Sequence, residues 1–196
     1  MSRSRHRVSL QLRPCSDDLS DEELRAILRA ADDLIMSGGR NLLAKVLKGS
    51  RAKKVLELGL DDNPAHGFYR SLSEDETLAR IDRAIVGGWL AIEYDGRLPL
   101  LVFTDRGWAI EREVRARELF DQMAENARRG PPFEVEMLRD RNRSMIWRLL
   151  DLVEASHDPD FIALLQAWGE IDYRKVRQRI RSVIAQLQAA RTAGSE

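Results

Sequence analysis

The chain contains 196 residues, of which 43% are hydrophobic and 33% are charged, and its 32 basic and 32 acidic residues cancel. This composition is typical of a globular protein with one domain or two small ones. No apolar run approaches the roughly 18 residues of a membrane-spanning helix, and no long apolar stretch follows the basic N-terminus as in a secretory signal. A single cysteine excludes an intrachain disulfide and suits a reducing compartment. We therefore expect a cytoplasmic protein that does not associate with membranes.

The first half of the chain predicts two longer helices with marked beginnings and ends. Ser20-x-x-Glu23 and Ser73-x-x-Glu76 have the spacing of a capping box, in which a serine and a glutamate close the first helical turn. Apolar residues follow each box at helical period. The glycine pairs Gly38-Gly39 and Gly87-Gly88 then end these two helices.

Shorter elements lie between and after these helices. We expect two short helices at 41–48 and 50–58, followed by a loop. After the second glycine pair the apolar period changes from helix to strand, and Asp95-Gly96 is a pair favoured in two-residue hairpin loops. Pro99 cannot donate a hydrogen bond to a ladder, so its N–H side should face outward. Several helices followed by one hairpin predict a winged helix, a mainly α fold with a β-hairpin wing.

The second half of the chain predicts only helices. A charged helix over 108–126 leads to the Arg-Arg-Gly-Pro-Pro stretch at 128–132, which is the best domain boundary in the chain. Three further helices are expected at 134–155, 159–168 and 171–190. The predicted organisation is a basic, flexible arm at 1–18, a winged-helix domain with flanking helices at 19–127, and a small α-helical domain at 133–191.

Cations gather at the junction between the two short helices. From Arg40 to Lys54 the sequence holds six basic residues and no acid. We expect Ser50 to N-cap the helix that follows, so that its first N–H groups and the flanking cations form an anion site. The alternative is a solvated surface turn whose cations bind nothing. The candidate phosphate ligands are Lys45, Lys48, Gly49, Ser50, Arg51 and Lys54.

Several short motifs occur in the order found in a known family. They are Gly49-Ser50, "LELG" at 57–60, "HGFYRSLSEDE" from His66, "ARIDRAIVGGWLAIE" from Ala79 and "TDRG" from Thr104. Over roughly residues 38–110 the chain resembles the RecQ C-terminal (RQC) winged-helix domain, and most closely its stand-alone RQC-minor type.

The resemblance implies a function in DNA binding. Domains of this family bind duplex DNA mainly through phosphates, and their hairpin wing can wedge at a duplex end or at a fork. Lys48, Ser50 and Arg51 match the motif that contacts phosphate in the family. Arg70 stands where the family often has a basic loop residue.

The predicted wing departs from the pattern of helicase-associated members, which can carry a long hairpin with an aromatic wedge. Tyr94 and Arg97 complete the candidate DNA-binding set, but the hairpin turns tightly at Asp95, whose charge repels phosphate. We therefore do not expect this wing to separate strands.

The C-terminal half loosely resembles HEAT-type helical pairs, in "DPDFIALLQAW" followed by "DYRKVRQRIRSVIAQL". At most two helix pairs fit, which is few for a solenoid, so a capping bundle or a dimerisation element is an alternative. In that case a protein partner or a second copy of the chain would bind these helices.

The basic residues of the last helix are interpreted as a solvated face or as partners for acids of the preceding helices. A second nucleic-acid surface is the alternative.

Signals for catalysis are missing from the sequence. His6, His66 and His157 lie far apart with no second ligand at metal spacing, and the acids after Cys15 would raise the pKa of its thiol. No GxxxxGK[ST] motif occurs, so the chain is not itself a helicase. We predict no enzyme activity, no cofactor and no metal.

The preferred hypothesis is a non-catalytic protein that binds duplex or forked DNA through phosphates. A sequence-specific transcriptional regulator would place the helix at 73–86 in a major groove, but that helix exposes four acids, which oppose approach to DNA. These acids are Glu74, Asp75, Glu76 and Asp82. A protein-interaction adaptor that has lost DNA binding is the third hypothesis, favoured by the acidic stretch at 57–82. Phosphate contacts do not distinguish DNA from RNA.

Overall fold

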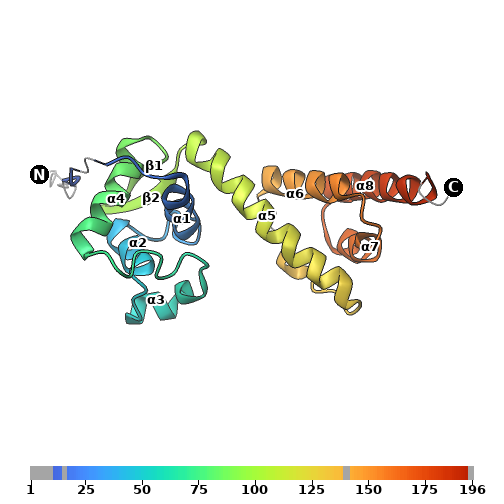
Figure 1. Ribbon diagram of the computed structural model, residues 1–196, viewed down its shortest axis with the longest axis horizontal. Helices are drawn as coiled ribbons and strands as arrows, with labels where there is room; N and C mark the ends of the chain where they lie inside the picture. Colours follow the sequence, from blue (N-terminus) through green and yellow to red (C-terminus); the bar gives the residue numbers. More distant parts are fainter. Residues whose placement is uncertain (1–10, 15–16, 139–141, 194–196) are drawn as a thin grey trace, which may run out of the picture. The chain divides into compact units, whose positions relative to one another are not determined.

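A computed structural model describes residues 11–14, 17–138 and 142–193 (Figure 1). The chain divides into two compact units, residues 1–111 and residues 112–196. Helix α5 (Asp105–Arg129) is continuous, beginning in the first unit and ending in the second. The domain boundary predicted from the sequence, at 128–132, lies at the other end of α5, where glycine and proline follow the helix. A division within a continuous helix leaves no such local signal in the sequence. His6 and Cys15 lie outside the described residues, as do the first ten residues of the predicted arm.

Helices make up most of the first unit. The structure has α1 at Asp21–Asp32, α2 at Arg40–Leu47, α3 at Lys53–Glu57, a short 3-10 helix η1 at Leu60–Asp62, and α4 at Glu74–Val86. Both predicted capping boxes are present. The Ser20 hydroxyl accepts from the Glu23 N–H at 3.2 Å and the Glu23 carboxylate accepts from the Ser20 N–H at 2.9 Å. The Ser73–Glu76 pair repeats this arrangement at 3.2 and 2.7 Å.

Two predicted helices are shorter than the sequence suggests. The first ends at Asp32, before the predicted glycine stop, and the chain then runs through turns to Ser37 while Leu34 stays buried. The helix expected at 50–58 shrinks to α3, a single turn of five residues. In the first case the apolar pattern continues beyond the helix because a buried turn also presents an apolar side chain to the core; in the second, the apolar Leu58 after α3 is 49% exposed and does not extend a buried face.

The hairpin follows α4. Strands β1 (Leu90–Asp95) and β2 (Leu98–Phe103) pair antiparallel, with Asp95 opposite Leu98, so the two loop residues are Gly96 and Arg97. The loop therefore lies one residue later than predicted. A pair of turn residues in the sequence does not distinguish between these two loop positions, because the strand register also depends on which side chains face the core.

The outer edge of β2 is bonded to the segment before α2. The Leu101 N–H donates to the Gly38 carbonyl at 2.9 Å, and the Met36 N–H donates to the Leu101 carbonyl at 3.1 Å. Pro99 lies two residues earlier on the same strand and faces the same side, away from β1. Its missing N–H therefore costs no hydrogen bond of the hairpin, as the sequence predicts.

The "TDRG" motif at the end of the wing joins the hairpin to α5. The Thr104 hydroxyl donates to the Gly88 carbonyl at 2.6 Å and accepts from the Gly107 N–H at 3.1 Å. A Cβ at Gly107 would lie 2.0 Å from the Trp89 carbonyl oxygen, so only glycine fits there. The Arg106 guanidinium lies over the Trp89 ring at 4.2 Å. The motif is thus explained by packing within the unit.

A single apolar core holds the first unit together. It combines the inner faces of α1, α2 and α4 with one face of the hairpin, as Figure 1 shows for these neighbouring elements. The fully buried residues at its centre are Ile27, Leu28, Leu43, Val46, Leu47, Ile81 and Leu101. The order of helices, wing and connecting segment confirms the predicted winged helix.

The regular elements described in the second unit are all helices. After the C-terminal part of α5 come a 3-10 helix η2 (Glu136–Leu138), α6 (Arg143–Ser156), α7 (Phe161–Ile171) and α8 (Arg174–Ala193). The helix expected at 134–155 begins only at Arg143, where Asn142 accepts from the Ser144 N–H at 2.9 Å and caps it. Buried Phe161, Trp168 and Val183 form part of the core of this unit. The HEAT-type resemblance stays a prediction.

Across residues 11–14, 17–138 and 142–193, none of the helices combines the length and apolar character needed to cross a bilayer.

The capping box of α1 makes stability depend on pH. Burial raises the pKa of Glu23, but hydrogen bonds from Ser20 and the nearby Arg80 outweigh it, and the net pKa lies below its ordinary value. A carboxylate with a lowered folded pKa stabilises above its unfolded pKa of about 4.3, and this contribution disappears as the pH falls through the folded value. We expect Glu23→Gln to show a smaller loss of urea midpoint on acidification than the wild type. Glu22→Gln, in the same turn but outside the cap, is the matched control; equal curves for both variants would contradict this assignment.

Candidate nucleic-acid interface

The Lys48-Gly49-Ser50 motif terminates α2. The Ser50 N–H donates to the Lys45 carbonyl and the Gly49 N–H donates to the Val46 carbonyl, both at 2.9 Å. Gly49 has φ +74°, and these two bonds with a left-handed residue between them define a Schellman motif. A side chain at Gly49 would also lie 3.1 Å from the Gly67 Cα. The glycine of the motif is therefore required by the helix end itself.

A loop of the same unit docks onto this helix end. The Gly67 N–H donates to the Val46 carbonyl at 2.9 Å, and the Tyr69 N–H donates to the Leu47 carbonyl at 2.7 Å. The His66 Nε2 lies 3.1 Å from the Ser50 carbonyl oxygen. The bond to Leu47 satisfies a carbonyl in the last turn of α2, and the bond to Val46 adds a second donor to a carbonyl that already accepts from the Gly49 N–H.

Lys48 belongs to the same docking arrangement. Its Nζ donates to the Arg70 carbonyl at 3.2 Å and to the Leu72 carbonyl. The ammonium therefore holds the loop just before α4 begins at Glu74. This side chain, predicted as a phosphate ligand, has internal acceptors in the structure, and its contact with phosphate stays a prediction.

The predicted N-cap role of Ser50 is wrong. The N-cap of α3 is Ala52, and no side chain caps this helix. The Ser50 hydroxyl accepts from the Ala52 N–H at 3.2 Å, which forms a local turn instead. The reason is that Gly49 and Ser50 form the C-terminal end of α2. Arg51 and Ala52 then separate this end from α3, which begins at Lys53.

A set of exposed cations remains around this junction. Lys45, Arg51 and Lys54 are exposed and form no ion pair with any residue that the structure describes. The neighbouring Lys53 pairs with Glu57 at 3.5 Å. Arg70 is exposed as well, and its Nε donates to the Gly67 carbonyl at 3.3 Å. Four of the nine predicted ligands thus carry charges directed to solvent close to the α2–α3 junction.

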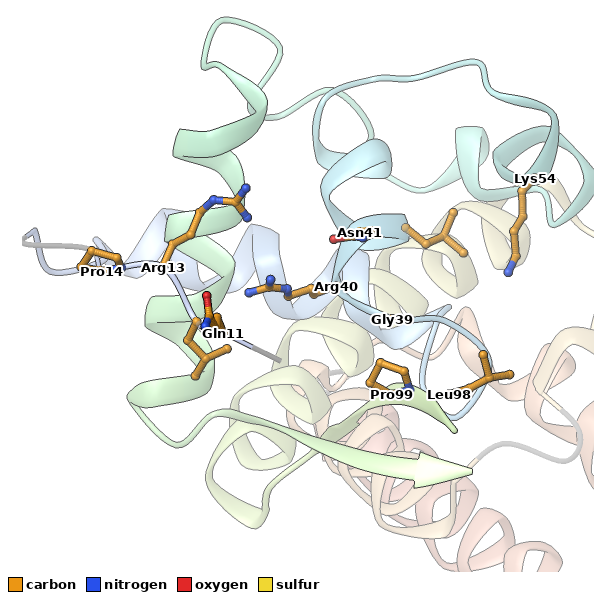
Figure 2. Close-up of a pocket in the computed structure, with 11 residues that line it drawn as sticks. Gln11, Arg13, Pro14, Gly39, Arg40, Asn41, Lys54, Leu98 and Pro99 are labelled. Atoms are coloured by element: carbon orange, nitrogen blue, oxygen red, sulfur yellow. The ribbon is translucent and has the colours of Figure 1, made fainter. Parts of the chain in front are cut away.

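A groove of about 970 Å³ lies beside the start of α2. Figure 2 shows Gln11 and Arg13 of the N-terminal segment on one side of it, Lys54 on the other, and Arg40 and Asn41 between them. Leu98 and Pro99, at the beginning of β2, complete the wall in Figure 2. Lys54 of the basic junction and the residues beside the wing tip therefore line the same groove.

The residues exposed at the wing tip are only partly those that the sequence analysis selected. Tyr94 is half-buried within β1, whereas Arg97 lies exposed in the loop. Leu98, which sequence reasoning missed, leaves 64% of its surface exposed beside the loop. In the sequence Leu98 stands two residues after the predicted Asp95-Gly96 turn, and no local signal distinguishes it from the apolar residues that follow it in the strand.

Arg40 does not contribute a free charge to the basic junction. Its NH1 donates to both oxygens of Asp82 at 2.6 and 2.5 Å, and the Arg13 N–H donates to the same carboxylate at 2.6 Å. The Asp82 side chain is 0% exposed. The expectation that α4 displays Asp82 to solvent is therefore wrong, because this position of the helix faces the start of α2.

The N-terminal segment covers the outer face of α4. Arg13 pairs with Asp75 at 2.8 Å, Arg80 pairs with Asp17 at 3.5 Å, and Arg83 pairs with Asp18. Both cations of this face are thus neutralised by acids from the described part of the predicted arm. Glu74 and Glu76 remain exposed in the first turn.

We expect Lys48→Ala to reduce the stability of the chain by about 1 kcal/mol, since two carbonyls lose a charged donor in a partly exposed site. Urea denaturation measures this loss. Lys45→Ala removes an exposed lysine from the same helix and is the matched control, expected within about 0.5 kcal/mol of the wild type. Equal stability of the two variants would mean that the contacts of Lys48 contribute nothing.

The comparisons with known proteins match the chain to one family. The family model of the RQC domain matches residues 18–125, which is more than half of the chain. The match ends within α5 and leaves α6, α7 and α8 outside it. No curated protein and no solved structure matches the chain.

Proposed function

Because the chain belongs to the RQC domain family, a family of winged-helix DNA-binding domains, we propose that it binds duplex DNA through phosphates and catalyses no reaction. The contacts are made by Lys45, Arg51, Lys54 and Arg70, with Arg97 added from the wing. These five residues are the predicted DNA ligands whose charged side chains are exposed. Lys48, Gly49 and Ser50 instead stabilise the conformation of the junction.

The observation that carries the proposal is the uncompensated charge of the junction. No acid occurs between Arg40 and Lys54, and the exposed Lys45, Arg51 and Lys54 have no ion-pair partner among the described residues. Lysine and arginine that neutralise DNA phosphates release counterions, which supplies affinity without reading a base. The groove beside Lys54 then offers the backbone a path toward the wing.

The surface of α4 supports backbone contact over base reading. In a winged helix the helix before the wing is the one that could enter a major groove. Here its first turn exposes Glu74 and Glu76, and its Arg80 and Arg83 are paired with acids of the N-terminal segment. A helix with this charge pattern is repelled by phosphates at the groove edges.

The proposal is tested by fluorescence anisotropy with duplex, forked and single-stranded DNA and matching RNA at several salt concentrations. We expect duplex binding with little sequence preference and a log–log salt slope of about −3 to −4.5, from three to five phosphates at about −0.9 each. No detectable binding at about 50 mM salt, where phosphate contacts are strong, would overturn the proposal. That result would favour the adaptor, in which the exposed acids of α4 meet a protein partner.

A further inference from the structure

Helix α8, in the unit outside the matched family region, has an unusual charge composition. Between Arg174 and Ala193 it contains six basic residues and no acid. One of them, Arg179, serves the fold: it pairs with Asp151 at 2.7 Å and with Glu154 at 2.9 Å on α6. The hydrogen bonds that Arg179 donates to Glu154 lower the pKa of that carboxyl group, and the bonds that it donates to Glu154 and Asp151 raise the pKa of Arg179. This confirms for Arg179 the predicted role as a partner of preceding acids.

The other cations near the start of α8 have no such role. Arg174, Lys175, Arg177 and Arg181 are exposed and form no ion pair within the described part of the chain. At 3.6 residues per turn, Arg174, Arg177 and Arg181 lie within an arc of roughly 60° and rise by about 4.5 and 6 Å between neighbours. The exposed residues that share this face are glutamine, alanine and threonine, so no acid interrupts the row.

An exposed aromatic residue stands at the beginning of this row. Tyr173 leaves 61% of its surface exposed and borders a cavity of about 340 Å³. Leu138, Ile146 and Val176 give the cavity an apolar wall, and Arg143 and Lys175 place cations at it. Asp172 also lines it, but its carboxylate accepts from the Trp168 indole N–H at 2.7 Å and from the Tyr173 N–H at 2.6 Å.

We propose that this surface binds single-stranded DNA. An unpaired base stacks on Tyr173 at the cavity, and the phosphates of the strand contact Lys175 and the row formed by Arg174, Arg177 and Arg181. An aromatic platform beside a cationic track is the arrangement that proteins use for unpaired strands, because every base has a face that can stack. A duplex keeps its base faces inside the helix, and an acidic peptide needs the cations but not the ring.

The choice of DNA over RNA rests on the proposed function, since a chain that holds a duplex meets the unpaired strand of the same DNA. The single-stranded contact itself rests on α8 and Tyr173 alone. The two can therefore fail separately. Loss of duplex binding in a variant of the α2–α3 junction leaves oligothymidine binding in place if both proposals hold.

The test uses the full chain and a labelled oligothymidine of about 16 nucleotides, with a hairpin duplex as the comparison probe. We expect a salt slope of about −2 to −3 for oligothymidine, from three or four phosphates at about −0.7 each. Tyr173→Ala should weaken oligothymidine binding roughly five- to hundredfold, and Tyr173→Phe should restore it, because stacking needs the ring and not the hydroxyl. Duplex affinity should not change in either variant.

Charge reversal tests the row independently of the ring. Arg177→Glu with Arg181→Glu should flatten the oligothymidine slope by about 1.4. Arg128→Glu with Arg129→Glu changes the net charge equally on exposed residues of α5 and should leave the slope unaltered. Should a reversed variant unfold, Arg177→Gln with Arg181→Gln removes the same contacts while keeping a good helix former.

Four results would overturn the inference. They are wild-type failure to bind oligothymidine, wild-type affinity in a folded Tyr173→Ala variant, equal losses in the α8 and α5 reversals, and displacement of oligothymidine by polyglutamate of equal charge. Tighter binding of oligouridine than of oligothymidine would overturn the choice of DNA.

Discussion

The double variant Arg51→Ala, Lys54→Ala is expected to bind every duplex sequence more weakly, with a salt slope flatter by about 1.8, or about 0.9 for each lost phosphate contact. Both side chains are exposed and unpaired among the described residues, so their removal leaves the core and the helix ends intact. The free energy of unfolding should stay within about 0.5 kcal/mol for each change. Anisotropy titrations at several salt concentrations, with urea denaturation alongside, give both quantities.

Arg25→Ala with Arg128→Ala is the matched control, because it removes the same charge from exposed positions on other helices. Its slope should equal that of the wild type. A flattening as large as that of the Arg51, Lys54 pair would show that net charge, and not the junction, determines binding. Lys48→Ala separates the two roles further, since its expected effect falls on stability.

Arg40→Met is expected to cost about 3–5 kcal/mol of unfolding free energy, more than Lys48→Ala or any of the surface charge changes. The variant leaves the Asp82 carboxylate, 0% exposed, with the Arg13 N–H as its remaining partner among the hydrogen bonds described. A buried charge without its counterion must be neutralised or exposed, and either change disrupts the contact between α2 and α4. Urea denaturation followed by circular dichroism measures the loss.

The double variant Arg40→Met, Asp82→Leu provides the decisive comparison. Removal of both charges in favour of apolar side chains of similar size should recover much of the stability lost in Arg40→Met. The exposed pair of Lys53 and Glu57 serves as the control, because Lys53→Ala should change stability by less than about 0.5 kcal/mol. An Arg40→Met variant as stable as Lys53→Ala would contradict the structural role of the buried pair.

The residues that sequence reasoning placed correctly are those whose partners lie nearby in the chain. Ser20 and Ser73 meet glutamates three residues later, and a hairpin needs only a short turn between two alternating segments. These interactions close within a few residues, so residue type and spacing decide them. The winged helix and the exposed charge of Arg51 and Lys54 followed from such local patterns.

The roles that the tertiary structure decided depend on distant partners. Lys48 meets carbonyls 22 and 24 residues away, and Arg40 meets Asp82 across 42 residues. In the sequence these two cations look the same as Arg51 and Lys54, because composition and period carry no information about which acceptor a long side chain reaches. The Ser50 prediction failed for a related reason: one Gly-Ser pair can end a helix or begin the next, and the loop docked on α2 selects the first. The sequence by itself thus determined the fold and the sign of the charge at the junction, while packing between distant segments decided which of those charges remain exposed without an internal partner among the described residues.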